Sequence, residues 1–207
     1  MDRSSNGHSK DPLPPAGKAI SEEDFQRLEP GDAILFWLKG SRIVSSIYDC
    51  SEVMEGQTTA WRWVFLDDGT MLEHSPDGDW LYTEHQVVNQ GSALYEELLA
   101  EDGALVRFEE RVRAQSSGRQ PVYVTLRDTR YRVTSTGTMA VRRKGDPPSL
   151  LPWQQFSSNP RDNVYFGMVN PDDDGQGVLG IWTGHVCLSY GRALEPTDIE
   201  AVYRKNR

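Results

Sequence analysis

The strongest constraint in this sequence is its succession of short β-type segments separated by turn residues, which begins at Gly31. In WRWVFL (61–66), Trp61, Trp63 and Phe65 alternate with Arg62, Val64 and Leu66. Successive side chains of a strand point to opposite faces, so this alternation is typical of a strand with two different faces. Asp67-Asp68-Gly69 follows as a tight-turn signal, and TMLEH comes next. The pattern predicts antiparallel hairpins and a β-rich fold.

The same reasoning divides the rest of the chain into elements. Strands are expected at 33–39, 41–50, 61–66, 70–74, 79–88, 104–114, 122–126, 131–135, 139–144, 163–169, 178–183 and 185–191. A helix is expected after Ser21, with Asp24 as its capping partner and Pro30-Gly31 as its end. Ser92 and Gly103 bound a second helix over 93–102, and Thr197 caps a short terminal helix over 197–204.

These elements predict an α+β fold that is predominantly antiparallel β, with two similar β-meander or small-barrel lobes joined by a short helix. The expected divisions are a disordered tail (1–18), a first β lobe with a leading helix (19–90), a connecting helix (91–103) and a second β lobe (104–207). WRWVFL-DDG-TMLEH resembles VYFGMV-NPDDDGQG-VLGIWT in the second half. Either an internal duplication or the shared composition of antiparallel hairpins explains this likeness.

Composition indicates the compartment. No run approaches the ~18 apolar residues of a membrane span, and the N-terminal residues lack the apolar stretch of a secretory signal. Two cysteines, Cys50 and Cys187, cannot form a disulfide framework, which fits a reducing compartment. We therefore expect a cytoplasmic protein.

Charge is unevenly distributed along the chain. The total is −9, but residues 46–104 carry one basic and 13 acidic side chains, and residues 105–145 carry 10 basic and three acidic ones. The total disfavours nucleic acid as a partner. A basic surface for a protein partner or an anionic membrane is predicted from Arg107, Arg111, Arg113, Arg142, Arg143 and Lys144. Alternatively, the acidic segment 46–104 covers these residues.

The tryptophans of the β segments are the other candidate binding residues. They either fill the core or line an aromatic groove for a peptide or a small ligand. The candidates are Trp61, Trp63, Trp80 and Trp182.

Catalytic and metal-binding patterns are weak. Asn170, Asp172, Asp174 and Gly175 match the opening of a calcium loop, but its closing glutamate would fall at Ile181. No metal, cofactor or catalytic residue is therefore assigned. An alternative is a cysteine- or metal-dependent hydrolase that uses Cys50 and His185, although Asp49 and Glu52 beside Cys50 would raise the pKa of its thiol.

Several segments resemble one bacterial family. YRVTSTGTMAV, WQQFS, NVYFGMV, VLGIWTGHVCLSYGRAL and DIEAVY in the second half, and DDGTMLEH and DWLY in the first, are similar to the domain of unknown function 4178 over roughly 30–204. The resemblance implies an accessory role in envelope or stress functions, since such proteins are often encoded near polyamine-synthase-like enzymes and small membrane proteins. It implies no catalytic residues.

Together these observations favour a non-enzymatic accessory or binding protein of a bacterial cytoplasm. Its expected partner is a protein, with peripheral attachment to an anionic membrane surface as a further option. The alternatives are the hydrolase described above and a sensor of polyamines or other small ligands.

Overall fold

The computed structural model describes residues 20–74, 80–88, 91–113, 121–126, 128–147, 156–182 and 186–205. The strands are β1 (Ala33–Phe36), β2 (Gly40–Met54), β3 (Gln57–Leu66), β4 (Thr70–His74), β5 (Trp80–Val88), β6 (Tyr123–Leu126), β7 (Thr129–Thr138), β8 (Ala140–Gly145), β9 (Val164–Asn170), β10 (Asp173–Trp182), β11 (Val186–Leu194) and β12 (Ile199–Tyr203). The helices are α1 (Glu22–Gln26), α2 (Ala93–Leu99) and α3 (Ala104–Arg113), with short 3₁₀ turns η2 (Pro160–Asp162) and η3 (Pro196–Asp198). The predicted disordered tail lies outside the described residues.

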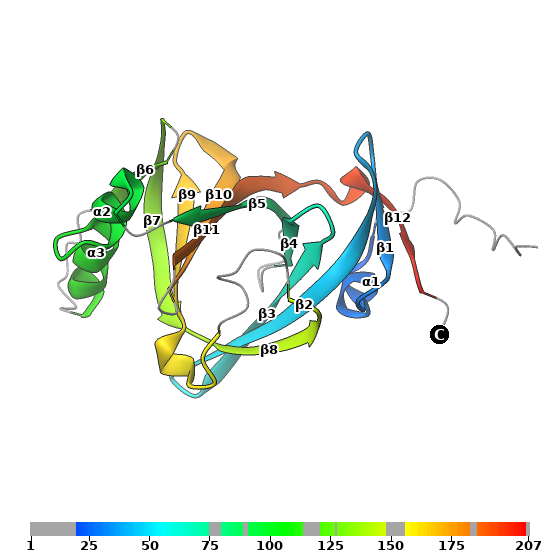
Figure 1. Cartoon of the computed structure of the whole chain (residues 1–207), viewed down its shortest axis with the longest axis horizontal. Helices are drawn as coiled ribbons and strands as arrows, with labels where there is room; N and C mark the ends of the chain where they lie inside the picture. The colour runs from blue at the N-terminus through cyan, green and yellow to red at the C-terminus, as the bar shows by residue number, and fades with distance from the viewer. Residues whose placement is uncertain are drawn as a thin grey trace, which may run out of the picture.

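All twelve strands belong to one antiparallel sheet (Figure 1). Their order is β12-β1-β2-β3-β4-β5-β11-β10-β9-β7-β6, and β8 pairs with β2. The predominantly antiparallel β architecture predicted from the sequence is confirmed. The predicted division into two lobes joined by a helix is not confirmed, because β5 of the first half pairs with β11 of the second along nine residues of each strand.

The sheet closes on itself through β8. Only Met139 separates the end of β7 from the start of β8. β8 then pairs with β2 in a register that runs from Ser46 opposite Gly145 to Ser51 opposite Ala140. Since β7 lies far from β2 in the strand order, this pairing curls the sheet into the ring seen in Figure 1.

The two halves of the chain repeat one strand order. In the first half, α1 precedes five strands that are neighbours in sequence order, from β1 to β5. In the second half, α2 and α3 precede β6, β7, β9, β10 and β11, which are also neighbours in sequence order. The similar segments noted in the sequence form the hairpins β3–β4 and β9–β10, which occupy equivalent positions in the two halves.

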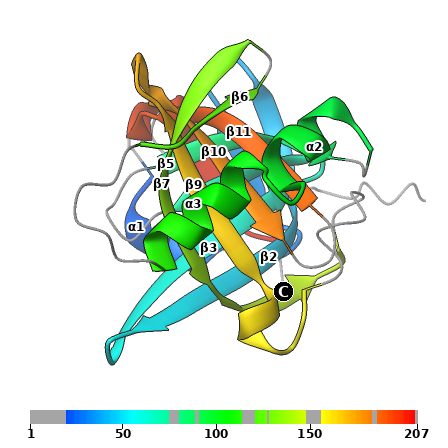
Figure 2. The same ribbon diagram turned by 90° about the vertical axis from the view of Figure 1, so that its left-hand side faces the viewer.

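The helices cover the outer face of the ring. Phe25 and Leu28, in and just after α1, pack on β1 to β4 with apolar residues such as Val64 and Leu72. On the opposite side, α2 and α3 lie across β7 and β9, as Figure 2 shows, and Leu98 and Leu105 pack there against strand residues that include Phe166. The inner face of the ring has a core of its own, described below.

Two predicted elements were wrong. Residues 104–113 form α3 rather than a strand, because buried Leu105 breaks the period-two pattern, and positions 105, 108 and 112 recur at helical spacing. Residues 199–203 form β12 rather than a helix, because β1 offers them an edge on which to pair. The caps predicted at Ser21 and Ser92 are confirmed: Ser21 and Asp24 form a capping box, and the Ser92 side chain accepts a hydrogen bond from the Tyr95 N–H. The cap predicted at Thr197 is wrong, because Thr197 lies inside η3, whose N-cap is Glu195.

A buried carboxylate ties the C-terminal strand to the start of the sheet. Asp32 is 1% exposed and accepts hydrogen bonds from the Glu29 N–H at 3.0 Å, the Lys205 N–H at 2.9 Å and the Arg204 guanidinium at 3.0 Å. Burial alone would raise the pKa of Asp32, but the two backbone bonds and Arg204 bring it below its usual value. The Asp32 carboxylate thus stabilises the fold in its charged form.

We expect Asp32→Asn to lower the free energy of unfolding by about 1–3 kcal/mol, because the amide cannot replace the charged acceptor. Urea denaturation at neutral pH measures this loss, which should disappear as the pH falls below the ordinary pKa of 3.8. Asp68→Asn is the matched control. Asp68 pairs with Arg42 at a position 28% exposed, so its loss should cost only about 0–1 kcal/mol. Equal losses for the two variants would contradict the anchoring role.

Candidate binding site on the inner face

The inner face of the ring carries a cluster of aromatic and sulfur-containing side chains, called the inner cluster below. The side chains of β3 alternate between the two faces of the sheet. Trp61, Trp63 and Phe65 point to the inner face and Arg62 points to the other, as the sequence predicted. Its members are Tyr48, Cys50, Trp61, Trp63, Phe65, Met71, Met139, Val141, Phe156 and Tyr165.

Ring contacts connect the inner cluster. The ring of Trp61 lies 5.4 Å from that of Tyr165 and 6.3 Å from that of Trp63, both edge-on. Phe156 lies 6.2 Å from Trp63 and 5.3 Å from Tyr48. Trp61, Val141, Phe156 and Tyr165 remain partly exposed. The cluster therefore keeps aromatic surface that another molecule can reach.

A carboxylate lies in the same layer. Glu73 on β4 is the cross-strand partner of Trp63, and Trp63 is in turn the partner of Tyr48. Burial raises the pKa of Glu73 to about 7, and the Trp63 indole N–H that faces the carboxylate lowers it only in part. No lysine or arginine among the described residues forms an ion pair with Glu73.

A second carboxylate, that of Glu52 near the end of β2, stabilises the closed ring through hydrogen bonds. It accepts hydrogen bonds from the Tyr165 hydroxyl at 2.7 Å and from the Thr138 N–H at 3.1 Å. Gly137 permits this approach, because a Cβ there would lie 2.1 Å from a carboxylate oxygen of Glu52. Burial and the Glu52 carboxylate together raise the pKa of Tyr165. Glu52 thus has two hydrogen-bond partners among the described residues, whereas Glu73 faces the Trp63 indole.

The surroundings of Cys50 disfavour a hydrolase. Its thiol is 2% exposed and donates to the Tyr48 carbonyl oxygen at 3.8 Å. Burial raises the pKa of the thiol, and the nearby charges of Glu73 and Asp49 raise it further. A nucleophilic cysteine needs the opposite environment. His185 lies outside the described residues.

Two of the four candidate tryptophans lie together in the inner cluster. Trp63 is fully buried, and Trp61 is partly exposed. Trp80 pairs in register with His74, and Trp182 pairs with Val164 and Val186. The side chains of Trp80 and Trp182 lie outside what the structure describes.

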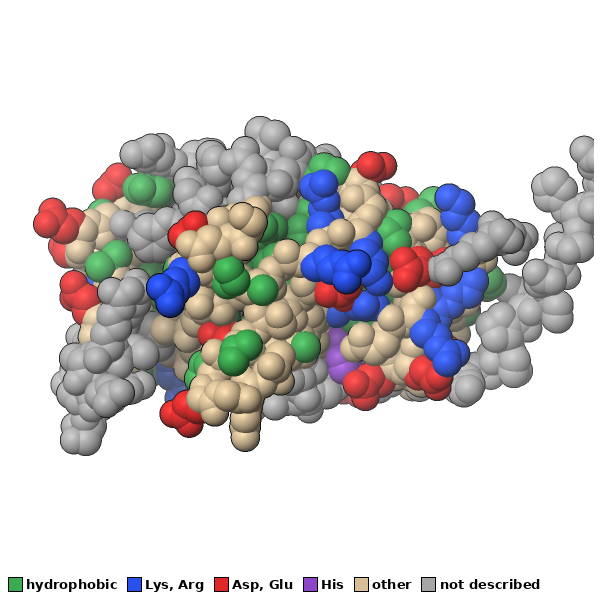
Figure 3. Space-filling model, turned by 90° about the horizontal axis from the view of Figure 1, so that it is seen from below, with side chains coloured by type: hydrophobic (Ala, Val, Ile, Leu, Met, Phe, Trp, Pro, Cys, Tyr) green, Lys and Arg blue, Asp and Glu red, His purple; other side chains and the backbone are tan. Residues whose placement is uncertain are grey.

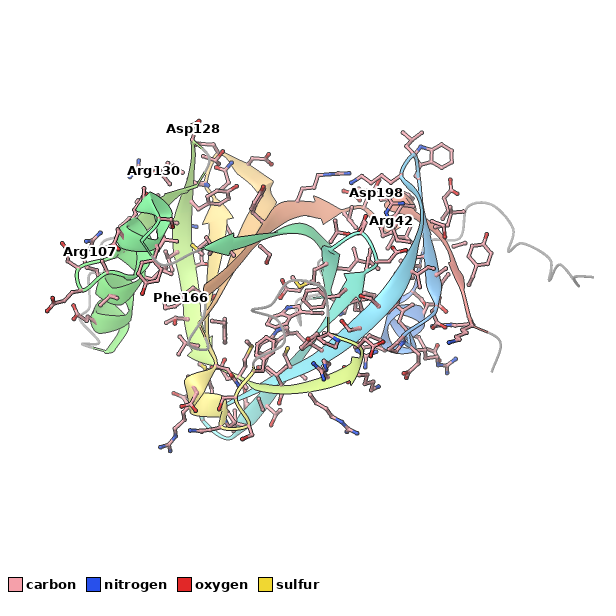
Figure 4. The ribbon with its side chains drawn as sticks, in the orientation of Figure 1. Arg42, Arg107, Asp128, Arg130, Phe166 and Asp198 are labelled. Atoms are coloured by element: carbon pink, nitrogen blue, oxygen red, sulfur yellow. The ribbon has the colours of Figure 1, made fainter. Side chains whose placement is uncertain are left out.

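The six basic candidates are divided between two elements. Arg107, Arg111 and Arg113 belong to α3, and Arg142, Arg143 and Lys144 belong to β8. Arg107, labelled in Figure 4, lies on the far side of the helices, where its guanidinium donates to the Asp102 carbonyl oxygen. The side chains of Arg111 and Arg113 lie outside the described residues.

The basic side chains of β8 lie beside acidic ones. Lys144 is 3.7 Å from Asp49 and 3.5 Å from Glu29, and Arg62 is 2.7 Å from Asp49. Figure 3 shows blue and red side chains intermingled on this lower face. Since Asp49 belongs to the acidic segment 46–104, part of the positive charge of β8 is covered internally.

Metal ligands do not gather in the described part of the chain. No three His, Cys, Asp or Glu side chains there lie close enough to hold a metal ion. At the β9–β10 turn, the Asn170 side chain accepts a hydrogen bond from the Asp172 N–H at 3.0 Å, which is ordinary turn geometry. No described helix is long and apolar enough to cross a membrane.

Comparisons with known proteins give no relative. No protein-family profile matches the chain, and no curated protein and no solved structure is significantly similar to it. The site must therefore be interpreted from its own geometry.

Sequence reasoning overlooked Glu73, Glu52, Phe156 and Tyr165. A signal for Glu73 was present, because in TMLEH the period-two alternation places it on the face of apolar Met71. Tyr165 and Phe156 could not be found in this way. They join the cluster only because β9 and the segment before η2 lie across the ring from β3.

The raised pKa of Glu73 has a consequence for stability. The folded protein binds a proton at Glu73 more tightly than the unfolded chain does, so this stabilisation is full at low pH. As the pH rises from 4.5 to about 7, we expect the free energy of unfolding to fall by up to about 3 kcal/mol. Urea denaturation across this range measures the fall. The pKa values of Asp32 and Asp68 are lowered, so these two groups change the stability at a pH below this range.

Glu73→Gln is the control for this pH dependence. Glutamine keeps the shape of the side chain but does not ionise, so most of the fall should vanish in the variant. An equal fall in the wild type and the variant would show that other groups cause it.

Proposed function

We propose that this protein is a non-enzymatic binding protein that holds an extended, apolar segment of a partner protein on the face of β12, β1 and β2 that points away from α1. This face lies at the right-hand end of the molecule in Figure 1. The observation that carries the proposal is the exposure of large apolar side chains there.

The strand registers align apolar side chains in rows on this face. Ala33 of β1 lies between Tyr203 of β12 and Ile43 of β2, and Leu35 lies next to Ala201. The alternate residues Ile34 and Phe36 face the core. Ile43 is 49% exposed, and the other four residues of these rows are partly exposed. The face thus resembles the centre of a protein interface rather than a solvated sheet surface.

The β1–β2 turn extends the same apolar surface. Trp37 is 60% exposed and Leu38 is 91% exposed. Leu38 has φ 63°, in the left-handed region that costs a non-glycine residue about 1–2 kcal/mol. The Trp37 N–H donates to the Asp198 carbonyl oxygen at 2.9 Å, which holds the turn against η3. Figure 4 labels Asp198 of η3 and Arg42 of β2 at this end of the molecule. A preorganised turn with an exposed tryptophan is well suited to anchor a partner.

An edge strand next to this face favours a protein segment as the occupant. β12 ends the strand order and pairs with β1 alone among the described strands. Its remaining backbone N–H and C=O groups can pair with an added strand, which would then lie beside Tyr203 and Ala201. A lipid surface could not use these backbone groups. A role in envelope or stress functions, a cytoplasmic location and membership of the domain of unknown function 4178 remain proposals that accompany this one.

The test is site-specific photo-crosslinking in the native host, with a photoreactive amino acid at position 38. We expect it to join the chain to one protein, which mass spectrometry identifies. With that purified partner, Trp37→Ser/Leu38→Ser should raise the Kd at least about 30-fold, because a buried tryptophan anchor contributes about 2 kcal/mol or more.

Val53 and Met54 provide the matched control. They are 70% and 60% exposed at the other end of β2, just before the β2–β3 turn. Val53→Ser/Met54→Ser should leave the Kd unchanged. Equal weakening by both double variants, or binding to anionic vesicles that depends on Trp37 and Leu38, would contradict a protein segment at this face.

A further inference from the structure

The apolar row on β12 continues into a cation. Ala201, Tyr203 and Lys205 follow one another at two-residue intervals, so their side chains lie on the same face, the one that points away from α1. Lys205 is exposed, and its side chain lies against Gly31, where an added Cβ would come within 2.7 Å of the Lys205 Cδ. A segment bound along this row therefore meets apolar side chains first and an ammonium group at the end.

Lys205 differs from the arginines around it. It forms no ion pair with a carboxylate of the described residues. The neighbouring arginines all have carboxylate partners, namely Arg42 with Asp68, Arg192 with Asp198 and Arg204 with Asp32. The ammonium group of Lys205 is thus available to an acidic group of a partner.

The backbone of β12 decides which of its residues an added strand would bond to. The Asp32 carbonyl oxygen accepts a hydrogen bond from the Val44 N–H of β2 at 2.8 Å, so the next residue, Ala33, directs its backbone groups toward β12. Ala33 is the register partner of Tyr203, whose backbone groups therefore point to β1, and those of Val202 point to the free edge. An added strand would bond to Val202 and would meet Tyr203 in a pair without hydrogen bonds, where opposed side chains come closest.

The two ends of the row differ in charge. Asp198 and Glu200 lie at the end next to Trp37, whose N–H donates to the Asp198 carbonyl oxygen, whereas Lys205 lies at the other end. Opposite charges in directly opposed positions of neighbouring strands stabilise the pairing, and like charges destabilise it. An acidic side chain of a partner is therefore favoured beside Lys205 and disfavoured near Trp37.

We propose that the partner segment pairs antiparallel to β12 and carries an aspartate or glutamate opposite Lys205, followed at alternate positions by apolar residues opposite Tyr203 and Ala201. The orientation follows the described strand pairs, which are all antiparallel. Along the partner the pattern is acidic-x-apolar-x-apolar, where x is any residue. This inference rests on the proposed function and adds to it the chemistry of the bound segment.

The first test selects peptides on the full-length protein from a display library of random twelve-residue sequences. We expect the peptides whose binding is lost in Trp37→Ser/Leu38→Ser to share the acidic-x-apolar-x-apolar pattern. Peptides that need Trp37 and Leu38 but lack the pattern would overturn the inference and leave the proposed function standing. If no selected peptide needs Trp37 and Leu38, the proposed function fails and this inference fails with it.

A charge exchange at Lys205 tests the pairing directly with one selected peptide. Lys205→Glu should raise the Kd about fivefold, because an attractive cross-strand pair becomes a repulsive one. Replacing the acidic residue of the peptide by lysine should restore binding to this variant and weaken binding to the wild type. A Kd that is the same in the wild type and in Lys205→Glu for both peptides would overturn the inference.

Two further variants separate this effect from changes in folding and in net charge. Lys205→Gln places no new charge near Asp32, and it should bind the acidic peptide and its glutamine version equally. Arg161→Glu changes the net charge as much as Lys205→Glu does, but the exposed Arg161 belongs to η2, which lies across the molecule from β12 in Figure 1. It should leave the Kd unchanged, and equal weakening by Arg161→Glu would contradict a specific pair at Lys205.

Discussion

The pairing of β2 with both β3 and β8 is the interaction on which the rest of the structure depends. β2 is 15 residues long, so β1 can pair with its first part while β3 and β8 pair with the remainder. Glu52 reinforces the closure by bonding to Tyr165 on β9 and to the Thr138 backbone. Without β8 on β2 the sheet would lose the strand pairing that connects β7 back to β2 and closes the ring.

Closure of the ring creates two faces with different roles. Outside, α1 covers the first half and α2 with α3 covers the second, each over its own core. Inside, no described helix contributes to the cluster, so its aromatic residues pack on one another and on Glu73. The face of β12, β1 and β2 that points away from α1 extends beyond the ring, and Ile43 and Trp37 remain exposed there. The ring thus separates the inner cluster from the apolar rows on β12, β1 and β2.

Sequence reasoning succeeded where local signals agreed with the tertiary structure. The hairpin of β3 and β4, the caps at Ser21 and Ser92, and the face shared by Trp61 and Trp63 were all predictable from turn residues and alternation. It failed where two periodicities fit the same residues. In 104–113, alternation favoured a strand, but burial of Leu105 under α2 and against β7 favours the helix. The segment 199–203 became a strand because β1 had a free edge.

The sequence by itself determined the β-rich character of this protein, its turns, its helix caps and the alternation of its strands, because these depend on residues a few positions apart. The tertiary structure decided which strands are neighbours, and therefore which side chains meet. Tyr165 reaches Glu52, 113 positions away in the sequence, and Tyr203 pairs with Ala33, because the sheet brings distant segments of the chain together. Patterns among neighbouring residues do not determine such pairings. The inner cluster and the apolar face of β12, β1 and β2 could therefore be identified only in the folded chain.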